Sequence, residues 1–294
     1  MVFLHDLLSQ TLAGPHFVRI LKHPRSQCSV VLVGEEHTNQ FQCQSGQDVV
    51  EVLKQCVRAG CHLYVELPPR FEKQDSTSMQ CTARPVNRAR DDVLNELRTC
   101  LIVMRADAQL ADRIVFTDIR DCVGGLPYSA EENEYEREIC QVYNDGDIER
   151  AREMVADRFI PAMEAMYDAA VVPDLRFRQL LQSKCCPEDR YIVEQWNTLV
   201  RRPLRQAEQH LQTSNFVQEV VDLYRLAMDS CMEIYTAFRM CCDMRAHCSP
   251  ENNCFVFYAG SAHAVAVSDM FRSRGFGRVA CALEQVACVK AKLQ

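Results

Sequence analysis

The sequence predicts an α/β protein with a mostly parallel central sheet flanked by helices and interrupted by a large all-helical insertion. Near both ends of the chain, short β-branched and aromatic runs alternate with amphipathic segments, which is the pattern of a parallel sheet with crossover helices. None of the 10 glycines lies between Gly146 and Gly260, and this long gap carries charged segments with helical periodicity. With 294 residues, 48% of them hydrophobic, the chain can build one large core.

The first part of the chain alternates strands and helices. A strand is predicted wherever a short β-branched run is bounded by turn residues, and a helix wherever apolar residues recur every three to four positions. Gly60 is expected to end the first helix in the left-handed conformation. The predicted strands are residues 29–33, 62–66 and 113–117, and the predicted helices are residues 48–59 and 91–111.

The insertion and the closing part follow the same reasoning. Helices are expected from about residue 129 to residue 247, and the best-defined one covers residues 215–245. The chain then closes the same core with a strand at 254–258, a loop at 259–263, a helix at 264–274 and a strand at 278–283. We therefore predict an N-terminal half of the core (1–128), a helical insertion (129–248) and a C-terminal half of the core (249–294).

Composition limits the classes of partner. The formal net charge of −7 disfavours nucleic acid as a partner. No apolar run approaches the roughly 20 residues that cross a bilayer, so no membrane partner is expected. The first residues lack the pattern of a signal peptide, and the 17 cysteines cannot all pair. We expect mostly reduced thiols in a cytoplasmic protein, located in the host cytoplasm or the virion if the chain is viral.

Ionisable residues follow the predicted strands directly. Glu35 and His37 come after the first strand, Glu66 ends the second, Arg120 follows the third, and His263 follows the fourth. Since the carboxyl ends of parallel strands share one edge of a sheet, where ligands bind, we expect these side chains to converge.

Two of these residues belong to G-x-x-H motifs, which run from Gly34 to His37 and from Gly260 to His263. The glycine is expected to let the backbone turn sharply off the strand. A neutral imidazole at such a position can bind a metal ion or act as a general base, and a neighbouring carboxylate fixes its tautomer.

Four segments carry a resemblance to a known superfamily: Val33-Gly-Glu-Glu-His37, Tyr64-Val-Glu66, Thr117-Asp-Ile-Arg120 and Tyr258-Ala-Gly-Ser-Ala-His263. They resemble the motifs of the Tiki/TraB, erythromycin esterase and ChaN-like superfamily, whose α/β core is also interrupted by a helical insertion. The stretch Ile234-Tyr-Thr-Ala-Phe-Arg-Met240 looks like that of uncharacterised members from large DNA viruses.

The resemblance implies more than one chemistry. Tiki proteins are metal-dependent peptidases, erythromycin esterases use a histidine base to activate water, and ChaN-like proteins bind heme iron. Carried over to this chain, the resemblance implies a divalent ion (Mn, Co or Zn) as cofactor, with heme as the alternative. It implies the catalytic residues Glu35, His37, Glu66, Arg120 and His263, and the metal ligands His37, Glu66 and His263.

Three functions stay open from the sequence. The first is a hydrolase of ester or amide bonds that acts on a small molecule or a peptide. The second is a non-enzymatic protein that binds heme or another metal complex, and the third is a viral structural or interaction protein. Each candidate side chain also has a structural alternative: for Arg120, an ion pair with Asp118 or Asp121. The substrate, the metal and the oligomeric state are not determined by the sequence.

Overall fold

The protein is described here by a computed structural model. The described residues are 11–13, 17–24, 28–35, 47–67, 92–120, 130–168, 174–182, 189–249, 253–283, 288–290 and 292–293. The chain forms two compact units. Met1–Thr117 and Arg239–Gln294 make up the α/β unit, and Asp118–Phe238 make up the helical unit.

The predicted fold class is confirmed by the sheet of the α/β unit, which has seven strands in the order β10-β8-β2-β3-β7-β5-β6. Strands β3, β7, β5 and β6 run parallel, whereas β2 is antiparallel to both β3 and β8. The bounds are β2 Phe17–Lys22, β3 Ser29–Glu35, β5 His62–Val65, β6 Ile114–Phe116, β7 Cys254–Gly260, β8 Gly277–Leu283 and β10 Lys292–Leu293. A small second sheet joins β1 (Thr11–Ala13), β4 (Gln47–Asp48) and β9 (Cys288–Lys290).

Helices fill the predicted insertion and flank the sheet. Those of the α/β unit are α2 (Val49–Arg58), α3 (Asp92–Arg105), α4 (Ala108–Ala111) and α12 (Ser261–Ser273). Those of the helical unit are α6 (Ala130–Asn144), α7 (Ile148–Asp168), α8 (Leu175–Gln182), α9 (Arg190–Trp196), the π-helix η3 (Asn197–Arg201) and α10 (Arg202–His210). Helix α11 (Phe216–His247) contributes to both units. None of the described helices is long and apolar enough to cross a membrane.

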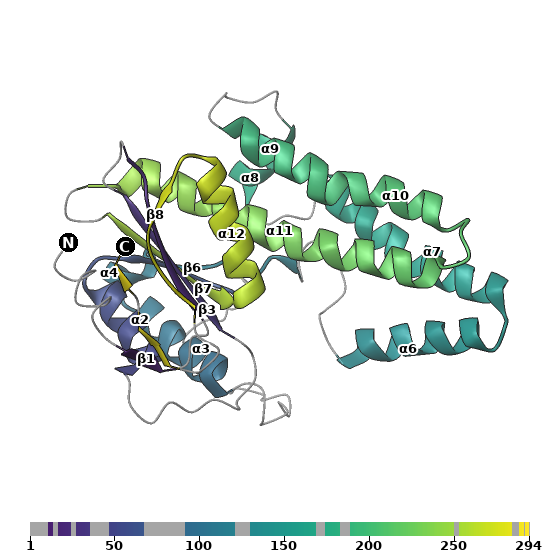
Figure 1. Ribbon diagram of the computed structural model, residues 1–294, viewed down its shortest axis with the longest axis horizontal. Coiled ribbons are helices and arrows are strands. Elements are labelled where there is room, and N and C mark those ends of the chain that lie inside the picture. The colour runs from purple at the N-terminus through teal and green to yellow at the C-terminus, as the bar shows by residue number, and fades with distance from the viewer. Residues whose placement is uncertain are drawn as a thin grey trace. The chain divides into compact units, whose positions relative to one another are not determined.

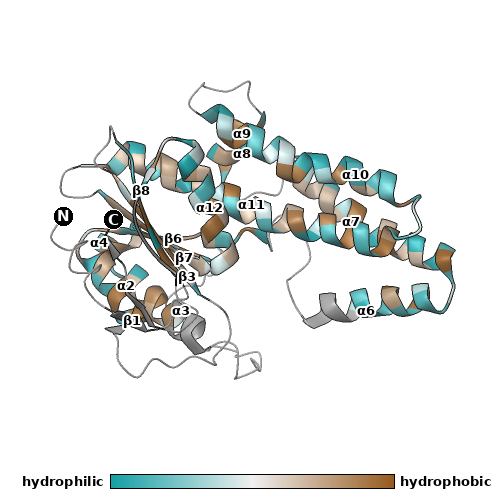
Figure 2. Cartoon of the chain, in the orientation of Figure 1, coloured by the Kyte–Doolittle hydropathy of each residue, from teal (hydrophilic) through white to brown (hydrophobic). Residues whose placement is uncertain are grey.

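The core of the α/β unit has two layers, one on each face of the sheet. Every residue of β3 is buried, as the uninterrupted apolar run predicts. Val31 and Val33 face α2 and α3, while Val30 and Leu32 face α12 and the last turns of α11. Figure 1 shows α2 and α3 on one side of the sheet and α12 on the other. In Figure 2 the brown of apolar residues is concentrated in these central strands.

Gly60 ends α2 as the sequence predicts. Its φ of 100° lies in the left-handed region, which glycine adopts at little cost. The N–H of Gly60 bonds to the carbonyl of Val57 at 3.0 Å, and the N–H of Cys61 bonds to that of Cys56 at 2.9 Å. This hydrogen-bond pair is a Schellman motif, in which the side chains at the positions of Cys56 and Cys61 approach each other.

The glycines of the two G-x-x-H motifs have a different role from the predicted one. Gly34 lies inside β3, where an added Cβ would overlap the ring of Phe17 and lie 2.8 Å from the Cα of Ser261. Gly260 has φ −55° and ψ 145°, which any residue adopts. At Gly260 the chain does pass directly from β7 into α12, but without a backbone conformation that requires glycine. At Gly34 the requirement is close packing of β3 against β2 and the start of α12.

One disulfide is present among the described cysteines. Cys28 and Cys248 are bonded, with their Cα atoms 6.3 Å apart, and they join the residue before β3 to the residue after α11. Among the residues whose side chains the structure describes, the following cysteines are free thiols: Cys56, Cys61, Cys100, Cys140, Cys231, Cys241, Cys242 and Cys254.

Replacing Gly34 with alanine should destabilise the α/β unit. The new methyl group would meet backbone at the Cα of Ser261, which cannot rotate away, so we expect a loss of about 1–3 kcal/mol in the free energy of unfolding. Gly277→Ala is the matched control, because the nearest atom to its Cβ lies 3.9 Å away. Urea unfolding followed by circular dichroism measures both, and equal stability of the two variants would contradict the packing explanation.

His62 lies on the opposite edge of the sheet from the G-x-x-H motifs. Its ring stacks against Phe255 and His247, with ring centroids 5.3 and 5.2 Å away. The side chain is buried, and its Nδ1 has no hydrogen-bond partner in the described part of the chain. Burial lowers the pKa of His62, and the nearby Asp243 opposes this shift only in part.

Acid should weaken the fold through His62. Because the pKa of His62 is lower in the folded chain, the unfolded chain binds the proton more readily as the pH falls. The stability that the neutral His62 ring contributes to the fold is therefore fully present above about pH 6.5 and is lost below it. We expect His62→Phe, which keeps the ring stack, to flatten the dependence of the unfolding midpoint on pH between 7.5 and 5. An unchanged slope in this variant would show that other groups cause the dependence.

Candidate functional site

The carboxyl ends of β3, β5 and β7 bring three of the predicted site residues to one edge of the sheet. Glu35 is the last residue of β3, and Glu66 directly follows β5. His263 lies in the first turn of α12, because the helix begins at Ser261, directly after β7. The loop predicted at residues 259–263 is therefore not formed. The strand register pairs Glu35 with Gly260, which fixes β3 beside the start of α12.

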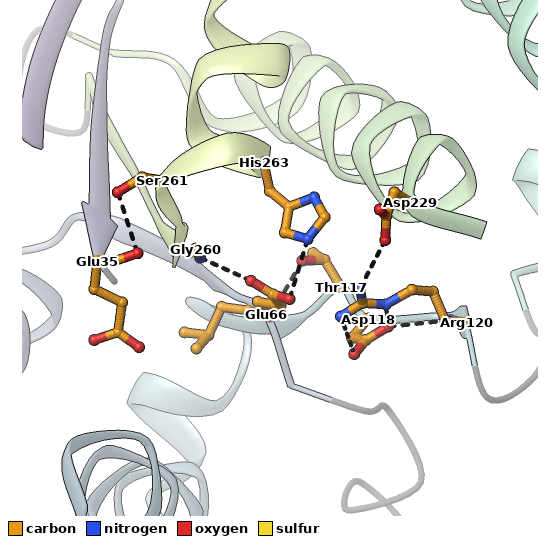
Figure 3. A network of polar contacts seen from close by, with 10 residues as sticks. Glu35, Glu66, Thr117, Asp118, Arg120, Asp229, Gly260, Ser261 and His263 are labelled. Atoms are coloured by element: carbon orange, nitrogen blue, oxygen red, sulfur yellow. Dashed lines mark hydrogen bonds and ion pairs between the residues drawn. The ribbon is translucent and has the colours of Figure 1, made fainter. Parts of the chain in front are cut away.

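Glu66 joins β5 to the start of α12. Its Oε2 accepts a hydrogen bond of 2.8 Å from the N–H of Gly260, the N-cap residue of the helix (Figure 3). Its own N–H donates to the carbonyl of Tyr258 at 3.1 Å. The positive end of a helix dipole stabilises an anionic side chain at this position. Glu66 is therefore a buried carboxylate held at a fixed place, and it does not face solvent.

The imidazole of His263 faces this carboxylate. Its Nε2 lies 3.5 Å from Oε1 of Glu66, and both side chains are largely buried (Figure 3). The two oxygens of Glu66 thus serve two different partners, the helix N-terminus and the histidine. This arrangement orients the imidazole by its Nε2 atom, which is the usual function of a carboxylate beside a catalytic histidine.

Glu35 contacts two residues that are not among the predicted site residues. The hydroxyl of Tyr258 donates a hydrogen bond to the Glu35 carboxylate, and the hydroxyl of Ser261 donates to the Glu35 carbonyl at 3.1 Å. The sequence places Tyr258 in a predicted strand and at the start of the Tyr258–His263 motif, but it assigns this residue no role at the site. Its place two residues before Gly260, on the same face of β7, was the available signal, because side chains alternate along a strand.

Arg120 lies in the helical unit and is held there by two carboxylates. Its Nε and Nη2 bond to Asp118 at 2.8 and 2.9 Å, and its Nη1 bonds to Asp229 of α11 at 3.0 Å. The guanidinium is buried. Asp118 is one of the two structural partners expected from the sequence, whereas no local pattern indicates Asp229, which is 109 residues away along the chain.

His37 and Glu36 lie outside the described residues, as does Asp121. Among the described residues, no group of three or more His, Cys, Asp or Glu side chains is arranged to hold a metal ion. Of the predicted ligands, only Glu66 and His263 are described, and both Glu66 oxygens already contact protein groups. The described donors do not by themselves fit a metal site, and the ligand role of His37 stays a prediction.

The sequence matches no protein-family model, no curated protein and no solved structure. The site is therefore defined by this chain's own structure. The carboxyl edge of its α/β sheet holds a buried glutamate–histidine pair.

Replacing Arg120 with methionine should lower stability, because it leaves Asp118 and Asp229 without the guanidinium. Hydrogen bonds to charged groups contribute roughly 1.5–3 kcal/mol, and we expect a loss of that size in the free energy of unfolding, measured in urea. Arg150→Met, at an exposed position of α7, is the control and should be near neutral. Unchanged stability of Arg120→Met would contradict a structural ion pair.

Proposed function

We propose that the chain is a hydrolase of ester or amide bonds in which Glu66 and His263 act together at the carboxyl edge of the sheet. The observation that supports this most is the contact set of Glu66, whose carboxylate accepts from the Gly260 N–H and faces Nε2 of His263. A carboxylate fixed in this way favours one tautomer and one orientation of the imidazole. The substrate class is a small molecule or a peptide.

In the proposed mechanism His263 is the general base. With Nε2 directed at Glu66, the imidazole takes a proton from a water molecule at Nδ1, and the water attacks the carbonyl carbon. Glu66 stabilises the imidazolium that forms, without taking the proton itself. The imidazolium then returns the proton to the leaving group. General acid–base catalysis of this kind contributes about 10²- to 10⁴-fold to the rate.

Membership of the Tiki/TraB, erythromycin esterase and ChaN-like superfamily is part of this proposal, and the motifs around Glu35, Glu66 and His263 support it. A divalent ion (Mn, Co or Zn) would supply activated water, and it would require His37 beside Glu66 and His263. The proposal itself needs no step at a metal. The cytoplasmic location, and the absence of nucleic-acid and membrane partners, stay predictions.

The test is hydrolysis of a panel of chromogenic esters and fluorogenic peptides by the full chain and its variants. We expect His263→Ala and Glu66→Gln each to lower kcat/KM by about 10²-fold or more. The double variant should be little worse than either single one, because the two residues act as a unit. His210→Ala is the matched control, since this histidine pairs with Glu219 in the helical unit and should leave the rate unchanged.

Normal rates in both His263→Ala and Glu66→Gln, on a substrate that the wild-type chain hydrolyses, would contradict the proposal. Elemental analysis of the same samples tests the metal-dependent form. One divalent ion per chain that is lost in His37→Ala and His263→Ala would add a metal to the mechanism. A heme absorption band that depends on His263, without hydrolysis of any substrate, would favour the heme-binding function instead.

A further inference from the structure

Three thiols meet at the amino edge of the sheet, on the face covered by α2 and α3. Cys61 hydrogen-bonds through its sulfur with both Cys56 and Cys254. Cys56 and Cys61 are almost fully buried, whereas Cys254 is partly exposed. We call these residues the thiol cluster. It lies at the opposite end of β5 and β7 from Glu66 and Gly260, so the proposed hydrolase does not use it.

The local fold dictates this cluster. The Schellman motif at Gly60 brings the side chain of Cys61 onto that of Cys56, as its paired hydrogen bonds require. In the parallel register His62 pairs with Phe255, so the residues one position earlier, Cys61 and Cys254, also lie side by side. Parallel neighbours project to the same face of a sheet, and the third sulfur therefore arrives from β7.

The contacts make Cys61 the acidic member of the cluster. Hydrogen bonds from the thiols of Cys254 and Cys56 lower the pKa of Cys61 to about 4, although burial opposes the shift. The same contacts and burial raise the pKa of both donors. Cys61 is thus the thiol of the cluster that loses its proton most readily. A thiolate is the form of cysteine that reacts with oxidants.

We propose that Cys61 is a peroxide-sensitive modification site whose sulfenic acid is captured by Cys56. The oxidant is a small hydroperoxide, because the burial of Cys61 excludes bulkier reagents such as a tripeptide disulfide. Cys56 is the resolving thiol because the Schellman geometry turns its side chain toward Cys61, whereas the side chain of Cys254 runs parallel to that of Cys61. Cys254 is the positioning residue that holds the thiolate by its hydrogen bond.

The two steps balance. The Cys61 thiolate attacks one oxygen of hydrogen peroxide, the O–O bond breaks, and Cys61 sulfenic acid and hydroxide form. The sulfur of Cys56 then attacks the Cys61 sulfur and displaces hydroxide, which leaves as water with the Cys56 proton. The sum is two thiols and one peroxide giving one disulfide and two waters. Two equivalents of a small thiol reverse the modification by thiol–disulfide exchange.

The experiment treats the full chain with hydrogen peroxide at pH 6 and follows each cysteine by alkylation and peptide mass spectrometry. Cys140 is the internal control, because it is an exposed thiol of α6. We expect Cys61 to be oxidised faster than Cys140, despite its burial, and to end in a Cys56–Cys61 cross-link. The variants separate the roles of the two neighbours.

Cys56→Ser keeps a hydrogen-bond donor but removes the resolving sulfur, so Cys61 sulfenic acid should persist and react with dimedone. Cys254→Ala removes a donor, so the oxidation of Cys61 should slow by roughly tenfold while the cross-link still forms. The proposal is overturned if Cys140 is oxidised before Cys61, if Cys61 is cross-linked to a cysteine other than Cys56, or if Cys254→Ala reacts as fast as the wild-type chain. Hydrolytic activity is not part of the readout, so failure here leaves the proposed function untouched.

Discussion

The placement of β7 between β3 and β5 is the constraint on which the rest of the α/β unit depends. Strand β7 follows the long helical insertion, yet its neighbours both precede that insertion. The chain must therefore return to the middle of a sheet that it has already begun, and the buried apolar run at 255–259 supplies the driving force. Once β7 is in place, α12 starts beside the ends of β3 and β5, and Glu66 meets Gly260 and His263.

Strong local patterns made much of this fold predictable. Strands β3, β5, β6 and β7 are short and apolar, and the stop at Gly60 follows from local backbone preference. Strand β2 was missed, because Arg19 and Lys22 obscure its apolar pattern. In the structure the Arg19 guanidinium donates a hydrogen bond of 2.6 Å to the hydroxyl of Ser268 in α12. These residues are 249 positions apart in the sequence, so no local pattern indicates the contact.

The candidate site was predictable in part, for the same physical reason. Topology alone places Glu35, Glu66 and His263 at one sheet edge, since parallel strands share their carboxyl ends. The exact partners depend on tertiary contacts. Glu66 accepts a hydrogen bond from the N–H of Gly260, which lets a helix rather than a loop begin there. The two residues are 194 positions apart in the sequence. The pairing of Arg120 with Asp229 depends equally on the packing of α11.

The proposed chemistry depends on Glu66 orienting His263 through Nε2. The most direct test is the tautomer of His263, read from nitrogen chemical shifts in the ¹⁵N-histidine-labelled chain at a pH where the imidazole is neutral, with His263→Ala used to assign the signal. If Glu66 orients His263, the wild-type chain holds the Nε2–H tautomer and Glu66→Gln loses this preference. A Nδ1–H tautomer in the wild-type chain, unchanged in Glu66→Gln, would contradict it.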